Sequence, residues 1–139
     1  MTNVIMIVAL TIFGEASGEK FPGKHGVASV IWRRSNGHVS RFEQVCQAPR
    51  QFSCWGPGDI GPVVPHDAPS KRAWAECRML AAAMCSPDRT AFLPNIVATH
   101  FCTLGVHPSW AREMVLVAVI GGHKFFDDGC DMAGKESGL

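Results

Sequence analysis

The sequence lacks several features that would place it in a common functional class. It contains no Tyr, and its 13 Lys and Arg residues nearly balance its 12 Asp and Glu residues, for a formal net charge of +1. The largest basic clusters are the pairs Arg33-Arg34 and Lys71-Arg72, so the basic field that non-specific nucleic-acid binding needs is missing. We therefore expect no nucleic-acid partner. Because 47% of the 139 residues are apolar and only 18% are charged, we expect one folded, soluble domain.

A hydrophobic run long enough to span a membrane is also lacking. The mostly apolar stretch covers residues 4–13, about half of the roughly 20 residues that a span requires, and Glu15 follows after one glycine. No basic residue precedes the run, as a signal peptide would require, since Lys20 is the first. We predict a buried helix over residues 3–14 and no stable membrane insertion. A membrane-tethered start is the alternative.

Cysteine and histidine occur without the spacings that mark a metal site. The six cysteines form no C-x-x-C pair, and the six histidines form no H-E-x-x-H pair. Without an export signal, the cysteines are expected to be reduced thiols that pack as small apolar side chains. A zinc site would have to draw on His25, His100, His107 and His123, which are scattered along the chain. We expect no metal and no cofactor.

The periodicity of apolar residues predicts a mainly helical α+β domain with a small sheet. Helices are expected over residues 24–34 and 70–84, and from Ser109 to Gly121-Gly122, in addition to residues 3–14. The β-branched and aromatic segment 95–101 is predicted to be a strand that pairs with residues 123–126. Residues 37–69 show little periodicity and many Pro and Gly, which indicates a long functional loop. Residues 127–139 are predicted to be a polar tail.

The most distinctive candidate for catalysis is Glu15, which follows directly on the buried helix. Partial desolvation and the negative pole of a helix C-terminus would both favour its protonated form. A carboxylic acid that is still protonated can give a proton to the leaving oxygen of a glycosidic bond. We interpret Glu15 as a general acid. The alternative is a glutamate that simply begins a solvated loop.

Hydrolysis by two carboxylates would need a second acid near Glu15. The candidates are Glu19, Asp59, Asp67 and Glu113, and none has a context as distinctive as that of Glu15. Glu19 is only four residues away, but it also suits pairing with a nearby lysine or a helix start. One acid is sufficient where a hydroxyl of the sugar substrate itself attacks the cationic centre.

Two further segments combine side chains that suit a sugar, whose faces stack on aromatic rings and whose edges form hydrogen bonds. Residues 51–55 supply the candidate substrate-binding residues Gln51, Ser53 and Trp55, although Trp55 and its neighbour Phe52 would equally suit anchoring of the loop to the core. The second segment is Thr99-His100-Phe101. On a strand, Thr99 and Phe101 would share one face and His100 would take the other.

Five blocks, in this order, resemble the SleB-like cell wall hydrolases, which include spore-cortex-lytic enzymes and phage lysins. The resemblance covers about residues 7–126, and the blocks are Glu15-Ala16-Ser17-Gly18-Glu19, Gln51-Phe52-Ser53-Cys54-Trp55, Ala98-Thr99-His100-Phe101, Pro108-Ser109-Trp110 and Gly122-His123-Lys124-Phe125-Phe126. It implies a single lysozyme-like catalytic domain over residues 1–126, with Glu15 as the catalytic acid and base. It also implies that Glu19, Gln51, Thr99 and His100 are cleft or scaffold residues. The family commonly has Tyr where this chain has Phe101 and again near Phe126.

The resemblance also implies a function and a cellular context. The chain would be a peptidoglycan-degrading endolysin that cleaves the glycan strand between N-acetylmuramic acid and N-acetylglucosamine, as a lytic transglycosylase with one catalytic glutamate. The alternatives are a hydrolytic muramidase, a zinc-dependent N-acetylmuramoyl-L-alanine amidase, and a non-catalytic wall-binding module. The partner would be the peptidoglycan glycan strand. We expect a monomer held in the host bacterial cytoplasm until a holin gives it access to the wall.

Overall fold

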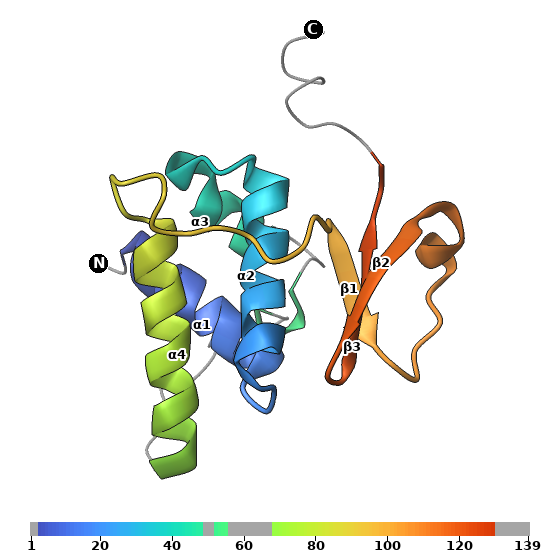
Figure 1. The fold of residues 1–139 in the computed structure, drawn as a ribbon, viewed down its shortest axis with the longest axis horizontal. Coiled ribbons are helices and arrows are strands. Elements are labelled where there is room, and N and C mark those ends of the chain that lie inside the picture. Colours follow the sequence, from blue (N-terminus) through green and yellow to red (C-terminus); the bar gives the residue numbers. More distant parts are fainter. Residues whose placement is uncertain (1–2, 49–51, 56–67, 130–139) are drawn as a thin grey trace, which may run out of the picture.

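The structure is a computed structural model that describes residues 3–48, 52–55 and 68–129. The helices are α1 (Val4–Ala16), α2 (Phe21–Ser35), α3 (Val39–Gln47) and α4 (Ala68–Met84), with the short 3-10 helices η1 (Ser53–Trp55) and η2 (Ser109–Glu113). The strands are β1 (His100–Thr103), β2 (Val115–Ile120) and β3 (His123–Asp127). Helices α1 and α4 lie on one side of α2, and the sheet lies on the other side (Figure 1). The predicted mainly helical α+β domain with a small antiparallel sheet is confirmed.

Helix α1 runs through the middle of the helical part and packs against the other three α-helices. Its sequence carries no charged side chain before Glu15, and Ile7, Val8 and Ile12 are buried. The Asn3 side chain caps the helix by accepting a hydrogen bond from the Met6 amide at 2.9 Å. The helix predicted from the apolar run is therefore present, and it extends far enough to include Glu15 in its last turn.

Helix α2 lies between the helices α1 and α4 and the sheet. It begins at Phe21, three residues before the predicted start, with Pro22 in its first turn. It ends at Ser35, one residue after the predicted end, because Asn36 adopts a left-handed conformation with φ of 54°. At Gly26 the Phe125 ring of β3 packs so closely that a Cβ would lie 2.7 Å from Cζ. This glycine lets the sheet approach the helix.

The predicted long loop over residues 37–69 is partly wrong. Residues 39–47 form α3, which buries Phe42 and Cys46, and residues 53–55 form η1. Residues 49–51 and 56–67 lie outside the described part of the chain. Helix α3 is only nine residues long, too short to be stable alone, and it forms by burying Phe42 and Cys46 as it packs against α1 and α2.

The predicted helix from Ser109 to Gly121-Gly122 is also wrong. Its first part is η2, and residues 115–120 form β2, an edge strand in a sheet of order β1-β3-β2. Both pairings are antiparallel, with His100 opposite Phe126 and Val119 opposite Lys124. The first predicted strand begins only at His100 rather than at residue 95, and β3 continues through Asp127 into the predicted tail.

Two findings on the described residues concern the expectations about membrane insertion and about the cysteines. No helix among them combines the length and the apolar character needed to cross a membrane. Five of the six cysteines lie in the described part of the chain, and all five are free thiols.

Candidate active site

Glu15 lies in the last turn of α1, where η1 supplies two hydrogen-bond donors to its carboxylate. Ser53 Oγ donates to Glu15 Oε2 at 3.1 Å, and the Cys54 amide donates to the same oxygen at 3.3 Å. The Glu15 side chain is half-buried. Two predicted site residues, Glu15 and Ser53, are therefore in direct contact although they lie 38 positions apart in the sequence.

Helix η1 is held against α1 by contacts on both sides of these donors. The Trp55 indole N–H donates to Thr11 Oγ1 at 2.8 Å, and the Cys54 thiol contacts the Thr11 carbonyl oxygen at 3.9 Å. Phe52 is buried with 3% exposure. Phe52 and Trp55 thus anchor the segment to the core, which was the alternative interpretation of this motif. The indole N–H of Trp55, predicted to bind substrate, is engaged by Thr11.

The thiol of Cys54 lies in the same environment as the Glu15 carboxylate. Burial and, as the second cause, the negative charge of Glu15 together raise the pKa of Cys54 to about 12. The thiol is therefore neutral at physiological pH. It acts as part of the packing around Glu15 and not as a nucleophile.

Glu19 lies in the connection between α1 and α2 and is directed toward the β2–β3 turn. Its Oε1 accepts a hydrogen bond from the Gly122 amide at 2.9 Å. The same oxygen lies 3.9 Å from Nδ1 of the buried His123. Glu15 and Glu19 are close in sequence, but their carboxylates contact different parts of the fold.

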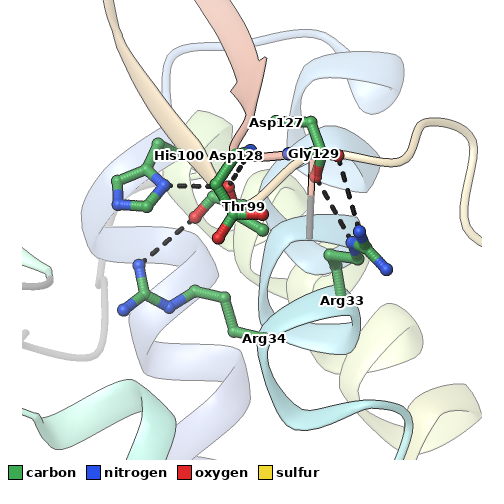
Figure 2. Close-up of polar contacts among 7 residues, drawn as sticks. All are labelled: Arg33, Arg34, Thr99, His100, Asp127, Asp128 and Gly129. Carbon is green, nitrogen blue, oxygen red and sulfur yellow. Dashed lines mark hydrogen bonds and ion pairs between the residues drawn. The ribbon is translucent and has the colours of Figure 1, made fainter. Parts of the chain in front are cut away.

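Thr99 and His100 belong to a polar cluster where β1, β3 and α2 meet, shown in Figure 2. Thr99 Oγ1 contacts His100 Nδ1 at 2.9 Å and accepts the Asp128 amide at 3.0 Å, while Arg34 Nη1 donates to the Thr99 carbonyl at 3.2 Å. Arg33 and Asp127 form an ion pair beside it, with Nε 3.3 Å from Oδ1. Thr99, predicted to bind substrate, is buried and has its hydroxyl occupied within the scaffold.

The charged groups of the same cluster affect the pKa of His100. Burial lowers its pKa, the positive charge of Arg34 lowers it further, and Asp128 and Asp127 act in the opposite direction. Its ring lies 5.1 Å from that of Trp110 in η2. We expect the imidazole to be neutral near pH 7 and available for hydrogen bonding or stacking.

Phe101 connects the sheet to η1. Its ring centroid lies 6.1 Å from that of Phe52, which precedes Ser53, and 5.2 Å from the His123 ring, which it meets edge-on. Phe101 therefore places the sheet against the segment that supplies the donors to Glu15. Of the other candidates, Gln51, Asp59 and Asp67 lie outside the described residues.

Sequence reasoning missed some residues that the structure brings to this region. Thr11 was expected only within an apolar run. His123 was expected as a possible zinc ligand, in a predicted strand and in the last of the five blocks, but no contact between it and Glu19 was predicted. A threonine within ten otherwise apolar residues is a weak signal for a buried hydrogen-bonding partner. Among the residues that the structure describes, no group of three His, Cys, Asp or Glu side chains is arranged to hold a metal ion.

The comparison with family models shows the family of the chain, and the comparison with solved structures shows its fold. The family described as Cell Wall Hydrolase matches residues 18–126, a stretch that begins three residues after Glu15. The chain is similar in structure to the catalytic domain of the Bacillus cereus SleB protein, with a TM-score of 0.59, 23% identity and 89% of each chain covered. It is also similar to the catalytic domain of the germination-specific lytic transglycosylase SleB from Bacillus anthracis, with a TM-score of 0.61 and 22% identity over 91% of this chain and 96% of that one. None of the curated proteins matches the sequence.

Proposed function

The chain belongs to the cell wall hydrolase family, and from this premise we propose that it cleaves the glycan strand of peptidoglycan between N-acetylmuramic acid and N-acetylglucosamine. The observation that carries the proposal is the half-buried Glu15 carboxylate, with Ser53 Oγ and the Cys54 amide both donating to Oε2. General acid catalysis of glycosidic cleavage needs one such positioned carboxylic acid.

The two donors support separate roles for the two oxygens of Glu15 in the proposed reaction. Since Oε2 accepts two hydrogen bonds, the acidic proton belongs on Oε1, from which it passes to the glycosidic oxygen as the bond breaks. After the transfer, the same two donors stabilise the carboxylate that remains. That carboxylate then removes a proton from the attacking hydroxyl, which returns Glu15 to its starting state.

We propose that the attacker is the 6-hydroxyl of the muramyl residue, which makes the reaction that of a lytic transglycosylase. The contacts of Glu19 support this choice, because its carboxylate accepts the Gly122 amide and faces His123. It is thus engaged with the sheet and is not placed beside Glu15 as a second acid. The structurally similar domain from Bacillus anthracis is described as a lytic transglycosylase, which also supports the proposal.

We further propose that the protein is a phage endolysin that acts as a monomer. The support is the resemblance of its five sequence blocks to a family that includes phage lysins. In this proposal it stays in the host cytoplasm until a holin opens the membrane. Cell fractionation with and without a co-expressed holin tests it, and envelope localisation without a holin would contradict it.

The decisive experiment is a digest of purified peptidoglycan with the protein and with Glu15→Gln, followed by mass spectrometry of the soluble products. We expect muropeptides about 18 Da lighter than the hydrolysed forms, since intramolecular attack forms an anhydro product without adding water. Glu15→Gln is expected to lose about 10²- to 10⁴-fold in kcat, the usual contribution of general acid catalysis. Glu43→Gln, a change at an exposed acid on α3, is the matched control and keeps full activity.

Other products would favour the remaining candidate functions. Reducing muropeptides would indicate a muramidase and require a second carboxylate. Free stem peptides with intact glycan, lost on addition of a chelator, would indicate a zinc amidase. Sedimentation with peptidoglycan without released fragments would indicate a binding module.

A further inference from the structure

A series of side-chain contacts connects Glu15 with Glu19 through η1 and the sheet. The first half runs through η1. Ser53 donates to Glu15, and the ring of its neighbour Phe52 lies 6.1 Å from that of Phe101 on β1. The segment that carries the donors to Glu15 therefore packs against the sheet through this ring contact.

The second half returns from the sheet to the connection between α1 and α2. The Phe101 ring meets the His123 ring edge-on at 5.2 Å, and His123 Nδ1 lies 3.9 Å from Glu19 Oε1. His123 is buried, and its Nδ1 is the one buried side-chain polar atom of the described residues without a hydrogen-bond partner. Glu19 is only four residues after Glu15 in the sequence. The contacts therefore connect the two glutamates through η1 and the sheet, in addition to their short connection along the chain.

Glu19 is firmly held at its end of this series of contacts. Its carboxylate accepts the Gly122 amide at 2.9 Å, while the Lys24 ammonium donates to its backbone carbonyl oxygen. Lys24 is 3% exposed and also forms an ion pair with Glu76 of α4 at 3.2 Å. Glu19 is thereby tied to the β2–β3 turn on one side and to two helices on the other.

Three glycines make room for the Glu19 side chain. A Cβ at Gly23 would lie 2.8 Å from Glu19 Cβ, and a Cβ at Gly122 would lie 3.1 Å from Oε2. At Gly121, where φ is 55°, a Cβ would overlap Oε1. The Glu19 side chain therefore lies against backbone that has no side chains, and it is only 19% exposed.

We propose that Glu19 is a positioning residue for Glu15. The contacts of Glu19 hold the β2–β3 turn near the end of α1. Through His123, Phe101 and Phe52, they also hold η1 in the position from which Ser53 and Cys54 donate to Glu15 Oε2. The inference rests on the proposed function, but it assigns Glu19 a role distinct from that of a second catalytic acid.

The test compares Glu19→Ala and Glu19→Gln with the matched control Glu43→Ala. For Glu19→Ala we expect kcat to fall about 10- to 100-fold with KM nearly unchanged, as for a small misplacement of a catalytic group. Glu19→Gln should recover part of kcat, because its amide oxygen can still accept the Gly122 N–H. Glu43→Ala should behave as the unsubstituted protein.

A second measurement does not depend on activity. The Cys54 amide donates to Glu15 Oε2, so its hydrogen exchange reports whether η1 stays in place. We expect its exchange to be at least about tenfold faster in Glu19→Ala than in the unsubstituted protein, and intermediate in Glu19→Gln. If Glu19→Ala does not fold, the glutamine variant carries the same comparison.

Two results would overturn the proposal. The first is unchanged kcat together with unchanged Cys54 exchange in the folded Glu19 variants. The second is a loss of kcat as deep as that of Glu15→Gln, in both variants and with Cys54 still protected, which would make Glu19 a second catalytic acid. If Glu15→Gln itself stays active, the proposed function fails, and Cys54 exchange alone then decides whether Glu19 positions η1.

Discussion

Two hydrogen bonds to one oxygen define the environment of Glu15. Glu15 lies in the last turn of α1, and η1 brings both donors to its carboxylate from a distant part of the sequence. The hydroxyl of Ser53 and the amide of Cys54 both donate to Oε2 and hold the carboxylate in place. An acid that gives a proton to the leaving oxygen and later takes one back needs such a fixed position.

The thiol of Cys54 provides a probe of this environment. Burial and the charge of Glu15 raise its pKa to about 12, so replacing Glu15 by Gln removes one cause and lowers that pKa. The thiolate is the reactive form, and we expect alkylation of Cys54 at pH 8.5 to become several-fold faster in Glu15→Gln. The measurement is the rate of iodoacetamide labelling of the Cys54 peptide by mass spectrometry.

Cys77 is the internal control for this experiment. Its pKa is also raised to about 12, mainly by burial, while the charge of Lys24 lowers it and that of Glu76 raises it. Its labelling rate should be the same in both proteins. An unchanged rate at Cys54 would show that Glu15 does not lie beside the thiol.

Residue types and positions predicted part of this site from the sequence. Glu15 was recognisable because it comes at the end of a long apolar run, and Ser53 because it lies in a mixed polar and aromatic segment. The hydrogen bond between them, 38 residues apart, depends on how η1 packs on α1. The partner of Trp55 was not predictable for the same reason, since the Thr11 hydroxyl has no distinguishing neighbours along the chain.

At the scale of elements, the errors occur where two local preferences compete. Residues 109–120 place Trp110, Met114, Val117 and Ala118 at helical spacing, but the run Val115–Ile120 is rich in β-branched residues that favour strands. Pairing with β3 supplies backbone hydrogen bonds that decide the outcome. The helix α1 was predictable because its long apolar run permits few other structures in a small domain.

The β2–β3 turn is the element on which the position of Glu19 depends. Gly121 has φ of 55°, and a Cβ there would overlap Glu19 Oε1. We expect Gly121→Ala to destabilise the protein by about 1–3 kcal/mol, because an alanine is strained at this φ and displaces the carboxylate. Urea unfolding followed by circular dichroism measures the change.

Gly18→Ala is the matched control, in the connection between α1 and α2 that also carries Glu19. Nothing lies within 4 Å of the position of its Cβ, and its φ is not in the left-handed region. This substitution should be neutral or stabilise the protein by less than about 1 kcal/mol, through lower entropy of the unfolded chain. Equal effects of the two substitutions would show that the carboxylate does not fill the space beside the turn.

At the scale of the whole molecule, α2 joins the helical part to the sheet. Its buried face packs on α1 and α4, and its C-terminal end contacts the sheet through Arg33 and Arg34. The fold class was predictable because apolar runs and breaks define most of the elements. The placement of the sheet was not, because it depends on pairs such as Arg33 and Asp127 that lie 94 residues apart.

The junction between α2 and the sheet makes the stability of the whole domain depend on pH through His100. Burial and then Arg34 lower the pKa of His100 in the folded protein, and Asp128 and Asp127 offset part of the shift. The unfolded chain takes up a proton at the ordinary value of about 6.5, so between the two values it binds more protons than the folded protein. The contribution of His100 to the free energy of unfolding is therefore complete above its pKa in the unfolded chain. It is lost as the pH falls toward its lower pKa in the folded protein. We expect His100→Gln to lose less Tm between pH 7.5 and pH 5 than the unsubstituted protein.

Thr103→Ala tests whether this difference belongs to the imidazole or to β1. Thr103 is exposed at the other end of β1 and has no titratable group, so its replacement disturbs the strand without removing a proton-binding site. It should lower Tm by a similar amount at both pH values and retain the full pH dependence. If His100→Gln retains that dependence too, the proton taken up on unfolding is bound elsewhere, and the junction around Thr99 does not exclude a charged imidazole.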